Sequence, residues 1–149
     1  MSVGTIIAVC TSKKKGTPKA DVGSGTLEVG YGLKDDVHGG DWHRQVSLLA
    51  IEQIETMKAK GLDVKPGSFA ENLTTSGFDL ASVKVGDRIR VGEEALLEVT
   101  QIGKECHTRC AIYNKVGECI MPEQGVFTTV IKGGTVSRGD SISFALHES

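Results

Sequence analysis

Polar and apolar side chains alternate between two glycines in Val85-Gly86-Asp87-Arg88-Ile89-Arg90-Val91-Gly92. Such alternation predicts a strand that buries one face. The pattern Gly-Asp-x-Ile returns near the end of the chain, in Arg138-Gly139-Asp140-Ser141-Ile142-Ser143-Phe144. Each copy predicts a turn that leads into a strand, although the shared pattern is too short to establish an internal repeat.

More strands are predicted on both sides of this stretch. Residues 97–101 alternate in the same way, residues 126–131 are rich in β-branched side chains, and residues 3–9 read V-G-T-I-I-A-V. Glycine is abundant, with 19 residues, whereas proline occurs only three times. Many short strands joined by tight glycine turns favour a mostly β fold: a barrel or strongly curved sheet with a few flanking helices.

One helix is predicted, over residues 47–60. Leu48, Ile51, Ile54 and Met57 recur at the helical period. Ser47 is a suitable N-cap residue, and a glycine at position 61 is typical of the residue that ends a helix. We expect this helix to pack against the sheet and to carry no chemistry.

Length and charge limit the function classes. A chain of 149 residues predicts one domain over residues 1–149. Its 17 basic and 19 acidic residues give a net charge of −2, which argues against nucleic acid or an anionic membrane as a partner. The first ten residues lack the pattern of a signal peptide, and no apolar run is long enough to span a membrane. We therefore expect a soluble, cytoplasmic protein.

Two polar segments are candidates for ligand contact. His38, His43 and Arg44 lie in a loop with several aspartates and with Gly39-Gly40, where the backbone can turn tightly or approach a ligand. Three interpretations stay open for this loop: a metal site, a polar surface that faces a ligand, and a loop bonded to itself. The spacing of the two histidines matches no standard zinc pattern.

The second polar segment is the pair Glu71-Asn72, which stands between Phe69 and Leu73. The two apolar side chains can anchor the pair. Asn72 is equally suited to bond its own backbone in a turn or to contact a ligand.

Three of the four cysteines fall close together, at Cys106, Cys110 and Cys119. In a cytosolic protein such a cluster indicates metal binding or reactivity more often than a disulfide. Lys104, His107 and Arg109 surround Cys106, with Glu105 as the one acid nearby, and neighbouring cations lower the pKa of a thiol. Cys106 is therefore the candidate reactive thiolate. A buried, inert cysteine, a structural zinc site and a redox-active disulfide remain as alternatives.

Several motifs taken together resemble the MOSC domain, a family named for the C-terminal domain of molybdenum-cofactor sulfurase. The resemblance extends from about residue 4 to residue 142, and its motifs occur in the family order. These motifs are V-H-G-G-D-W-H-R-Q-V-S-L-L (37–49), P-G-S-F-A-E-N-L-T-T-S-G-F-D-L (66–80), V-G-D-R-I-R-V-G (85–92), T-Q-I-G-K-E-C (100–106) and G-V-F-T-T-V-I-K-G-G-T-V-S-R-G-D-S-I (125–142).

The resemblance implies a small stand-alone MOSC protein with a β-barrel fold that binds the pterin-based molybdenum cofactor (molybdopterin). The functional cysteine of the family falls on Cys106, as a ligand of molybdenum or as a persulfide that carries sulfur, without pyridoxal phosphate. The implied partners are a sulfur donor such as a cysteine desulfurase and a molybdoenzyme acceptor. The residues that we expect to line the cofactor pocket are Lys104, His107, Arg109, His38, Arg44, Phe69, Glu71 and Asn72.

The chain departs from the family pattern beside this cysteine. Many members carry Pro-Arg where Ile102-Gly103 stand here, and a proline where Glu105 stands. Without that arginine, Lys104 and Arg109 are the cations left to contact a cofactor phosphate. Two other functions remain compatible with the sequence: a molybdenum-dependent reductase of N-hydroxylated substrates, and a zinc-binding module without catalytic activity.

Overall fold

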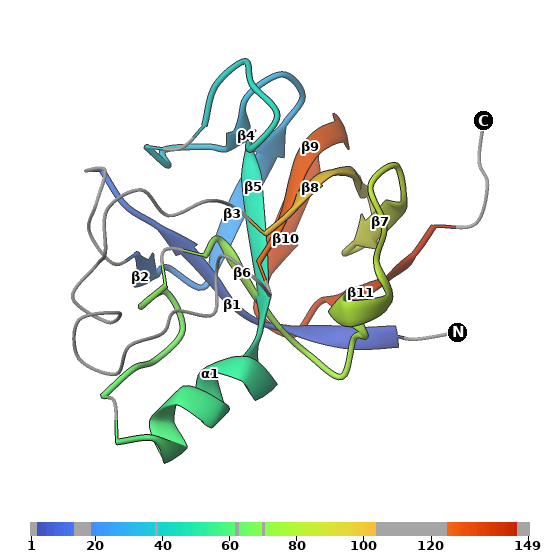
Figure 1. The fold of residues 1–149 in the computed structure, drawn as a ribbon. Coiled ribbons are helices and arrows are strands. Elements are labelled where there is room, and N and C mark those ends of the chain that lie inside the picture. The colour runs from blue at the N-terminus through green and yellow to red at the C-terminus, as the bar shows by residue number, and fades with distance from the viewer. Residues whose placement is uncertain are drawn as a thin grey trace.

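A computed structural model describes residues 3–13, 19–37, 39–61, 63–69, 71–103 and 125–145 (Figure 1). Strands dominate this part of the chain. The elements are β1 (Val3–Thr11), β2 (Ala20–Asp21), β3 (Ser24–Glu28), β4 (Gly32–Leu33), β5 (Val46–Ala50), α1 (Ile51–Ala59), β6 (Leu73–Ser76), the 3₁₀ turn η1 (Leu80–Ser82), β7 (Arg88–Val91), β8 (Ala95–Ile102), β9 (Val126–Lys132), β10 (Gly134–Ser137) and β11 (Ser141–Phe144).

The main sheet closes into a barrel. Its strand order is β11-β7-β8-β9-β5-β6-β1-β2, and an additional pairing of β11 with β1 joins the two sides. The pairing of β5 with β6 is parallel and the other pairings are antiparallel. Because parallel neighbours need a crossover, α1 lies in the connection between β5 and β6. A three-stranded sheet of order β10-β3-β4 completes the fold. The predicted mostly β barrel with a flanking helix is confirmed.

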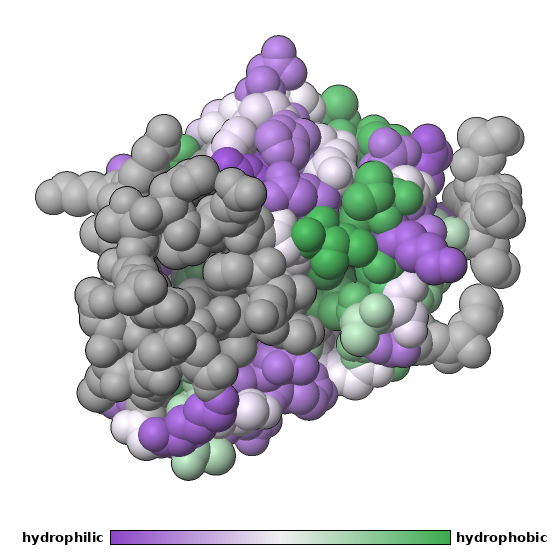
Figure 2. Space-filling model, in the orientation of Figure 1, coloured by the Kyte–Doolittle hydropathy of each residue, from purple (hydrophilic) through white to green (hydrophobic). Residues whose placement is uncertain are grey.

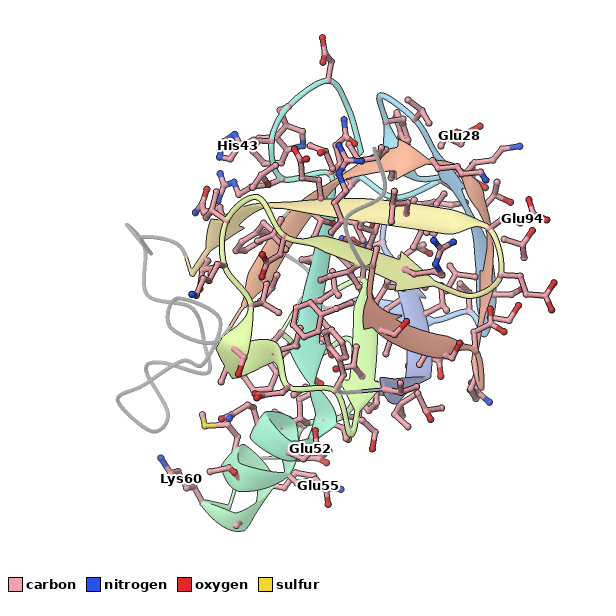
Figure 3. The ribbon with its side chains drawn as sticks, turned by 90° about the vertical axis from the view of Figure 1, so that its right-hand side faces the viewer. Glu28, His43, Glu52, Glu55, Lys60 and Glu94 are labelled. Carbon is pink, nitrogen blue, oxygen red and sulfur yellow. The ribbon has the colours of Figure 1, made fainter. Side chains whose placement is uncertain are left out.

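Two apolar clusters stabilise this arrangement. The larger cluster gathers the inward side chains of the barrel strands, among them Ile89 and Val91 of β7, both fully buried. In β7 the half-buried Arg88 and Arg90 alternate with these two residues, as the sequence predicted. The smaller cluster packs Ile54 and Met57 of α1 against Phe69 and Phe127. It attaches the helix to the outside of the barrel (Figure 3).

The helix begins four residues later than predicted, at Ile51. Residues 47–50 belong instead to β5, whose side chains are buried on both faces: Leu48 joins the barrel cluster and Leu49 the helix cluster. A short run that is apolar on both faces fits a buried strand as well as a helix, and pairing with two neighbouring strands decides between them. Ser47 is consequently not the N-cap; Ala50 holds that position without a side-chain hydrogen bond.

The two Gly-Asp turns have the same hydrogen bonds. The carboxylate of Asp87 accepts a bond of 2.9 Å from Lys84 N, and that of Asp140 accepts a bond of 2.8 Å from Ser137 N. The glycine before each aspartate has a positive φ, +96° in the first turn and +93° in the second, a backbone conformation that favours glycine. The strands that follow, β7 and β11, pair with one another in the barrel. The repeated Gly-Asp-x-Ile pattern in the sequence thus corresponds to two equivalent turns.

The surface of the described residues carries both polar and apolar side chains. Figure 2 shows an apolar area at the centre right of that face of the molecule, next to hydrophilic residues. The large apolar side chains that are exposed include Val85, Ile102 and Trp42. In the part of the chain that the structure describes, no helix has the length and apolar character needed to cross a membrane.

Candidate functional site

The predicted site residues divide into two groups. Lys104, Cys106, His107, Arg109 and His38 lie outside the described residues. Arg44, Phe69, Glu71 and Asn72 are described; Phe69 N donates to Glu71, whereas Arg44 forms no hydrogen bond with the other three residues. Asn72 and Glu71 belong to a buried polar network, Phe69 belongs to the smaller apolar cluster, and Arg44 contacts the rings of Trp42 and Phe127.

Asn72 is the centre of the buried polar network. Its Oδ1 accepts hydrogen bonds from Ser47 N at 2.9 Å and from Ser47 Oγ at 3.3 Å. Its Nδ2 donates to the carbonyl oxygen of Cys10 at 3.1 Å and to Asp36 Oδ2 at 3.0 Å. A side-chain amide offers two donors and two acceptor positions, and all four are used here. Asn72 therefore joins three segments that are distant in sequence.

A buried ion pair extends the network. Lys19 Nζ lies 2.6 Å from Asp36 Oδ1, and both side chains are completely excluded from solvent. The same carboxylate oxygen accepts a bond of 3.0 Å from Ser12 N. Burial raises the pKa of Asp36, but the hydrogen bonds from Lys19 and Asn72 outweigh burial, so that its pKa lies below the ordinary value. Sequence reasoning missed this pair, because nothing in the sequence distinguishes a lysine that is buried beside a carboxylate from an exposed one.

Glu71 forms a third part of the network and is also fully buried. It accepts hydrogen bonds from Gly67 N at 3.0 Å, Phe69 N at 3.3 Å and Thr74 Oγ1 at 2.7 Å. Burial raises the pKa of Glu71, although these hydrogen bonds oppose the shift. Gly67 has φ +92°, and a Cβ at this position would lie 2.1 Å from the carbonyl oxygen of Lys19. Glu71 thus orders a turn that only glycine can complete.

Arg44 has different surroundings. Its guanidinium carbon lies 4.6 Å from the ring centroid of Trp42 and 5.7 Å from that of Phe127. The Nε atom is buried and has no hydrogen-bond partner. A buried donor left unpaired costs about 1–3 kcal/mol, and more when it is charged. Phe127 is buried, whereas 38% of the surface of Trp42 is exposed. Arg44 is therefore a cation held by aromatic rings that lacks an acceptor for its buried N–H.

Hydrogen bonds attach the loop that carries Arg44 to β8. His43 Nε2 lies 2.8 Å from Gln101 Oε1, and Gln101 Nε2 donates to the carbonyl oxygen of Gly103 at 2.6 Å. The second bond orients the amide so that its oxygen faces the imidazole, which requires His43 Nε2 to carry the proton. The hydroxyl of Thr100 also bonds the carbonyl oxygen of His43. We call Trp42, His43, Arg44, Gln101 and Phe127 the Trp42 face. Figure 3 shows His43 at the end of the barrel away from α1.

The Trp42 face adjoins the end of β8, where β8 pairs with the beginning of β9. Gly103 N donates a bond of 2.7 Å to the carbonyl oxygen of Gly125, and Ile102 of β8 is in register with Val126 of β9. Because β8 and β9 remain paired up to these residues, positions 103 and 125, which flank the segment that carries Cys106 in the sequence, lie together at one edge of the barrel. This juxtaposition of Arg44 with these two positions is the candidate site. Among the described residues, no group of three or more His, Cys, Asp or Glu side chains could hold a metal ion.

Comparison with known proteins places the chain among others of the same architecture. A family model, the MOSC domain, matches residues 34–143. Among solved structures, the YUAD protein from Bacillus subtilis superposes with a TM-score of 0.76 at 20% identity, over 95% of this chain and 97% of that one. YiiM from Geobacillus stearothermophilus gives 0.70 at 19% identity, over 96% and 75% of the two chains. YiiM from Escherichia coli gives 0.67 at 24% identity, over 98% and 71%. No curated protein matches the sequence.

Proposed function

The chain belongs to the MOSC domain family, and from this premise we propose that it binds a molybdenum cofactor of the molybdopterin type. The proposed site is the Trp42 face together with the segment that carries Cys106. The family is generally linked to this cofactor. The observation that supports the proposal best is Arg44, a cation without a partner for its buried Nε, beside the pairing of Gly103 with Gly125.

The length of the chain limits how far the proposed thiol can lie from this edge of the barrel. Cys106 follows Gly103 by three residues, and three residues span at most about 11 Å. In the sequence, Lys104, His107 and Arg109 are the cations nearest to this thiol. We propose that they hold Cys106 as a thiolate and compensate the negative charge of the cofactor.

The chemistry of the described residues fits an anionic ligand at the Trp42 face. Arg44 can donate to a phosphate, and none of the described carboxylates forms an ion pair with it. Glu71 and Asn72 are bonded within the buried polar network, and we therefore propose that they order the segments below the site and do not contact the cofactor. When bound, the cofactor supplies a redox-active molybdenum, for which a thiolate is a suitable soft ligand.

The same thiolate can instead carry sulfur. In that role Cys106 receives sulfane sulfur from the persulfide of a donor protein, such as a cysteine desulfurase. The donor S–S bond breaks, the donor cysteine leaves as a thiol, and a persulfide forms on Cys106. A molybdoenzyme would be the acceptor. Both roles need an ionised thiol at position 106, and one pair of variants tests them together.

The test compares Cys106→Ser with Cys10→Ala. Cys10 is fully buried, and burial, with the negative charges of Glu71 and Asp21, raises the pKa of its thiol to about 12, so it is a matched control without reactivity. Each protein is incubated with released cofactor or with a persulfide donor. Molybdenum is then measured by elemental analysis, and bound sulfur by mass spectrometry of the intact protein.

We expect the wild type and Cys10→Ala to retain molybdenum or an added sulfur, and Cys106→Ser to lose it. Equal retention by all three proteins would refute the role of Cys106. Stoichiometric zinc in the protein as purified, with unfolding upon chelation, would replace the proposal with a zinc-binding module. Turnover of an N-hydroxylated substrate by the loaded protein, with an artificial electron donor, would identify the molybdenum role as that of a reductase.

A further inference from the structure

We infer that Arg44, with Trp42 and Phe127, forms a subsite for an oxyanion attached to a planar heterocycle, as in a pterin that carries a phosphate or a carboxylate. This inference rests on the proposed function, since it assigns one part of the cofactor to one part of the site. It adds a role for Trp42, and it specifies that Arg44 binds the anionic group.

The geometry of the arginine supports an oxyanion as its ligand. The two rings contact the guanidinium through its π system, at 4.6 and 5.7 Å from the ring centroids. Such contacts hold a cation in place but accept no strong hydrogen bond from its N–H groups. A guanidinium in this environment has a fixed orientation and donors that suit the bidentate recognition of phosphate or carboxylate.

Other arginines of the chain show how this residue type is otherwise used. Arg138 pairs with Asp21 at 2.5 Å, and Arg88 pairs with Glu98 at 3.4 Å. Both are strand or turn residues whose charge is neutralised on the surface. Arg44 is less exposed than Arg138, yet its buried Nε has no acceptor. A loop anchored at several points holds the guanidinium in place before a ligand arrives, which lowers the ordering cost of binding.

The anchoring of the loop is visible in the contacts around Trp42 and Arg44. His43, between them, is bonded through Gln101 to the carbonyl oxygen of Gly103, and its own carbonyl oxygen is bonded to Thr100. These contacts fix the loop to the end of β8, so that little loop ordering is required when a ligand binds. The indole of Trp42 has 38% of its surface exposed, and aromatic side chains in other proteins bind planar bases by stacking.

Trp42 also provides the assay, because it is the only tryptophan of the chain. Pterin-6-carboxylate is the probe, since it has the planar ring and one oxyanion. 6-Methylpterin, which has the ring alone, is the matched ligand control. Binding is followed by quenching of Trp42 fluorescence, and by calorimetry for variants in which the fluorescence of the free protein changes. The variants are Arg44→Gln, Arg44→Lys, Trp42→Leu and, as the control for net charge, Arg138→Gln.

We expect the dissociation constant of pterin-6-carboxylate to rise about 10–100-fold in Arg44→Gln, because one charge-assisted, bidentate contact is lost. Arg44→Lys retains the charge without the planar donor pair, so its dissociation constant should lie between those of the wild type and Arg44→Gln. Trp42→Leu should weaken the binding of both probes, whereas Arg138→Gln should leave both affinities unchanged. Thermal unfolding of each variant distinguishes a loss of binding from a loss of fold.

Two results would overturn the inference: equal affinity of Arg44→Gln and wild type for the carboxylate probe, or an equal loss of affinity for both probes in Arg44→Gln. Such a result leaves the proposed function intact if the wild type still binds molybdenum through Cys106. Retention of molybdenum by Cys106→Ser refutes the ligand role of Cys106 and does not affect the fluorescence result. The two experiments therefore fail independently.

Discussion

Asp36→Asn should destabilise the protein far more than the loss of a surface ion pair. Asp36 Oδ1 lies 2.6 Å from Lys19 Nζ, and the side chains of both residues have no solvent exposure. Asparagine removes the negative charge that lies directly against the buried ammonium of Lys19. In addition, both carboxylate oxygens of Asp36 accept hydrogen bonds, one from Lys19 and one from Asn72. An asparagine replaces one of these oxygens with an NH₂ group, which then faces another donor, either Asn72 Nδ2 or Lys19 Nζ.

Removal of one member of a buried ion pair costs about 3–5 kcal/mol. Since a domain of this size has a total stability of about 5–15 kcal/mol, the variant should lose a large part of it. The melting temperature should fall by roughly 6–20 °C. Arg138→Gln is the control: it breaks the pair with Asp21, in which 61% of the arginine side chain is exposed, and should cost about 0–1 kcal/mol because solvent screens the pair.

The assay is urea denaturation of Asp36→Asn, Lys19→Met and Arg138→Gln, and of the double variant Lys19→Met/Asp36→Asn, which removes both buried charges. We expect the double variant to be more stable than the sum of the single effects predicts, by about 0.5–3 kcal/mol. The pKa of Asp36 is lowered from 3.8, so its contribution is present above pH 3.8 and is lost as the pH falls toward the folded-state pKa. Equal free energies of unfolding for Asp36→Asn and Arg138→Gln would show that the pair does not hold the fold together.

Gly67→Ala should destabilise the protein by several kcal/mol, because its Cβ would lie 2.1 Å from the carbonyl oxygen of Lys19. Gly139→Ala is the control: its φ is almost equal, no atom lies within 4 Å of the added Cβ, and it should cost about 1 kcal/mol. Urea denaturation measures both. Native Cys10 should resist iodoacetamide at neutral pH and react only after unfolding, as read by mass spectrometry. The pKa of Glu71 is raised above 4.5, so the stability of the wild type relative to Glu71→Gln should be greatest below pH 4.5 and fall as the pH rises toward the folded-state pKa. A flat difference between pH 4 and pH 8 would contradict this last expectation.

The strands were largely predictable because their signal is local. Alternation with period two in β7 and the glycine turns before β7 and β11 follow from sterics and burial within a few residues. The start of α1 was not predictable in the same way. Leu48 and Leu49 fit the helical period, and their assignment to β5 depends on pairing with β6 and β9, which are distant in sequence. A local pattern cannot contain information about that competition.

The residues of the candidate site were also only partly predictable, because the sequence does not show which polar side chains already have hydrogen-bond partners. Asn72, Glu71 and Arg44 were equally plausible ligand residues in the sequence, because all three are polar and lie in polar segments. The structure separates them. Asn72 and Glu71 use their hydrogen-bonding positions on Ser47, Asp36 and the turn at Gly67, so a ligand would have to break existing bonds to engage them. For Arg44 no existing bond to its Nε has to be broken. A polar group that is ordered but unpaired gains most from a ligand. This difference depends on the partners of each side chain and not on its type. It is the reason to expect the anionic ligand at Arg44.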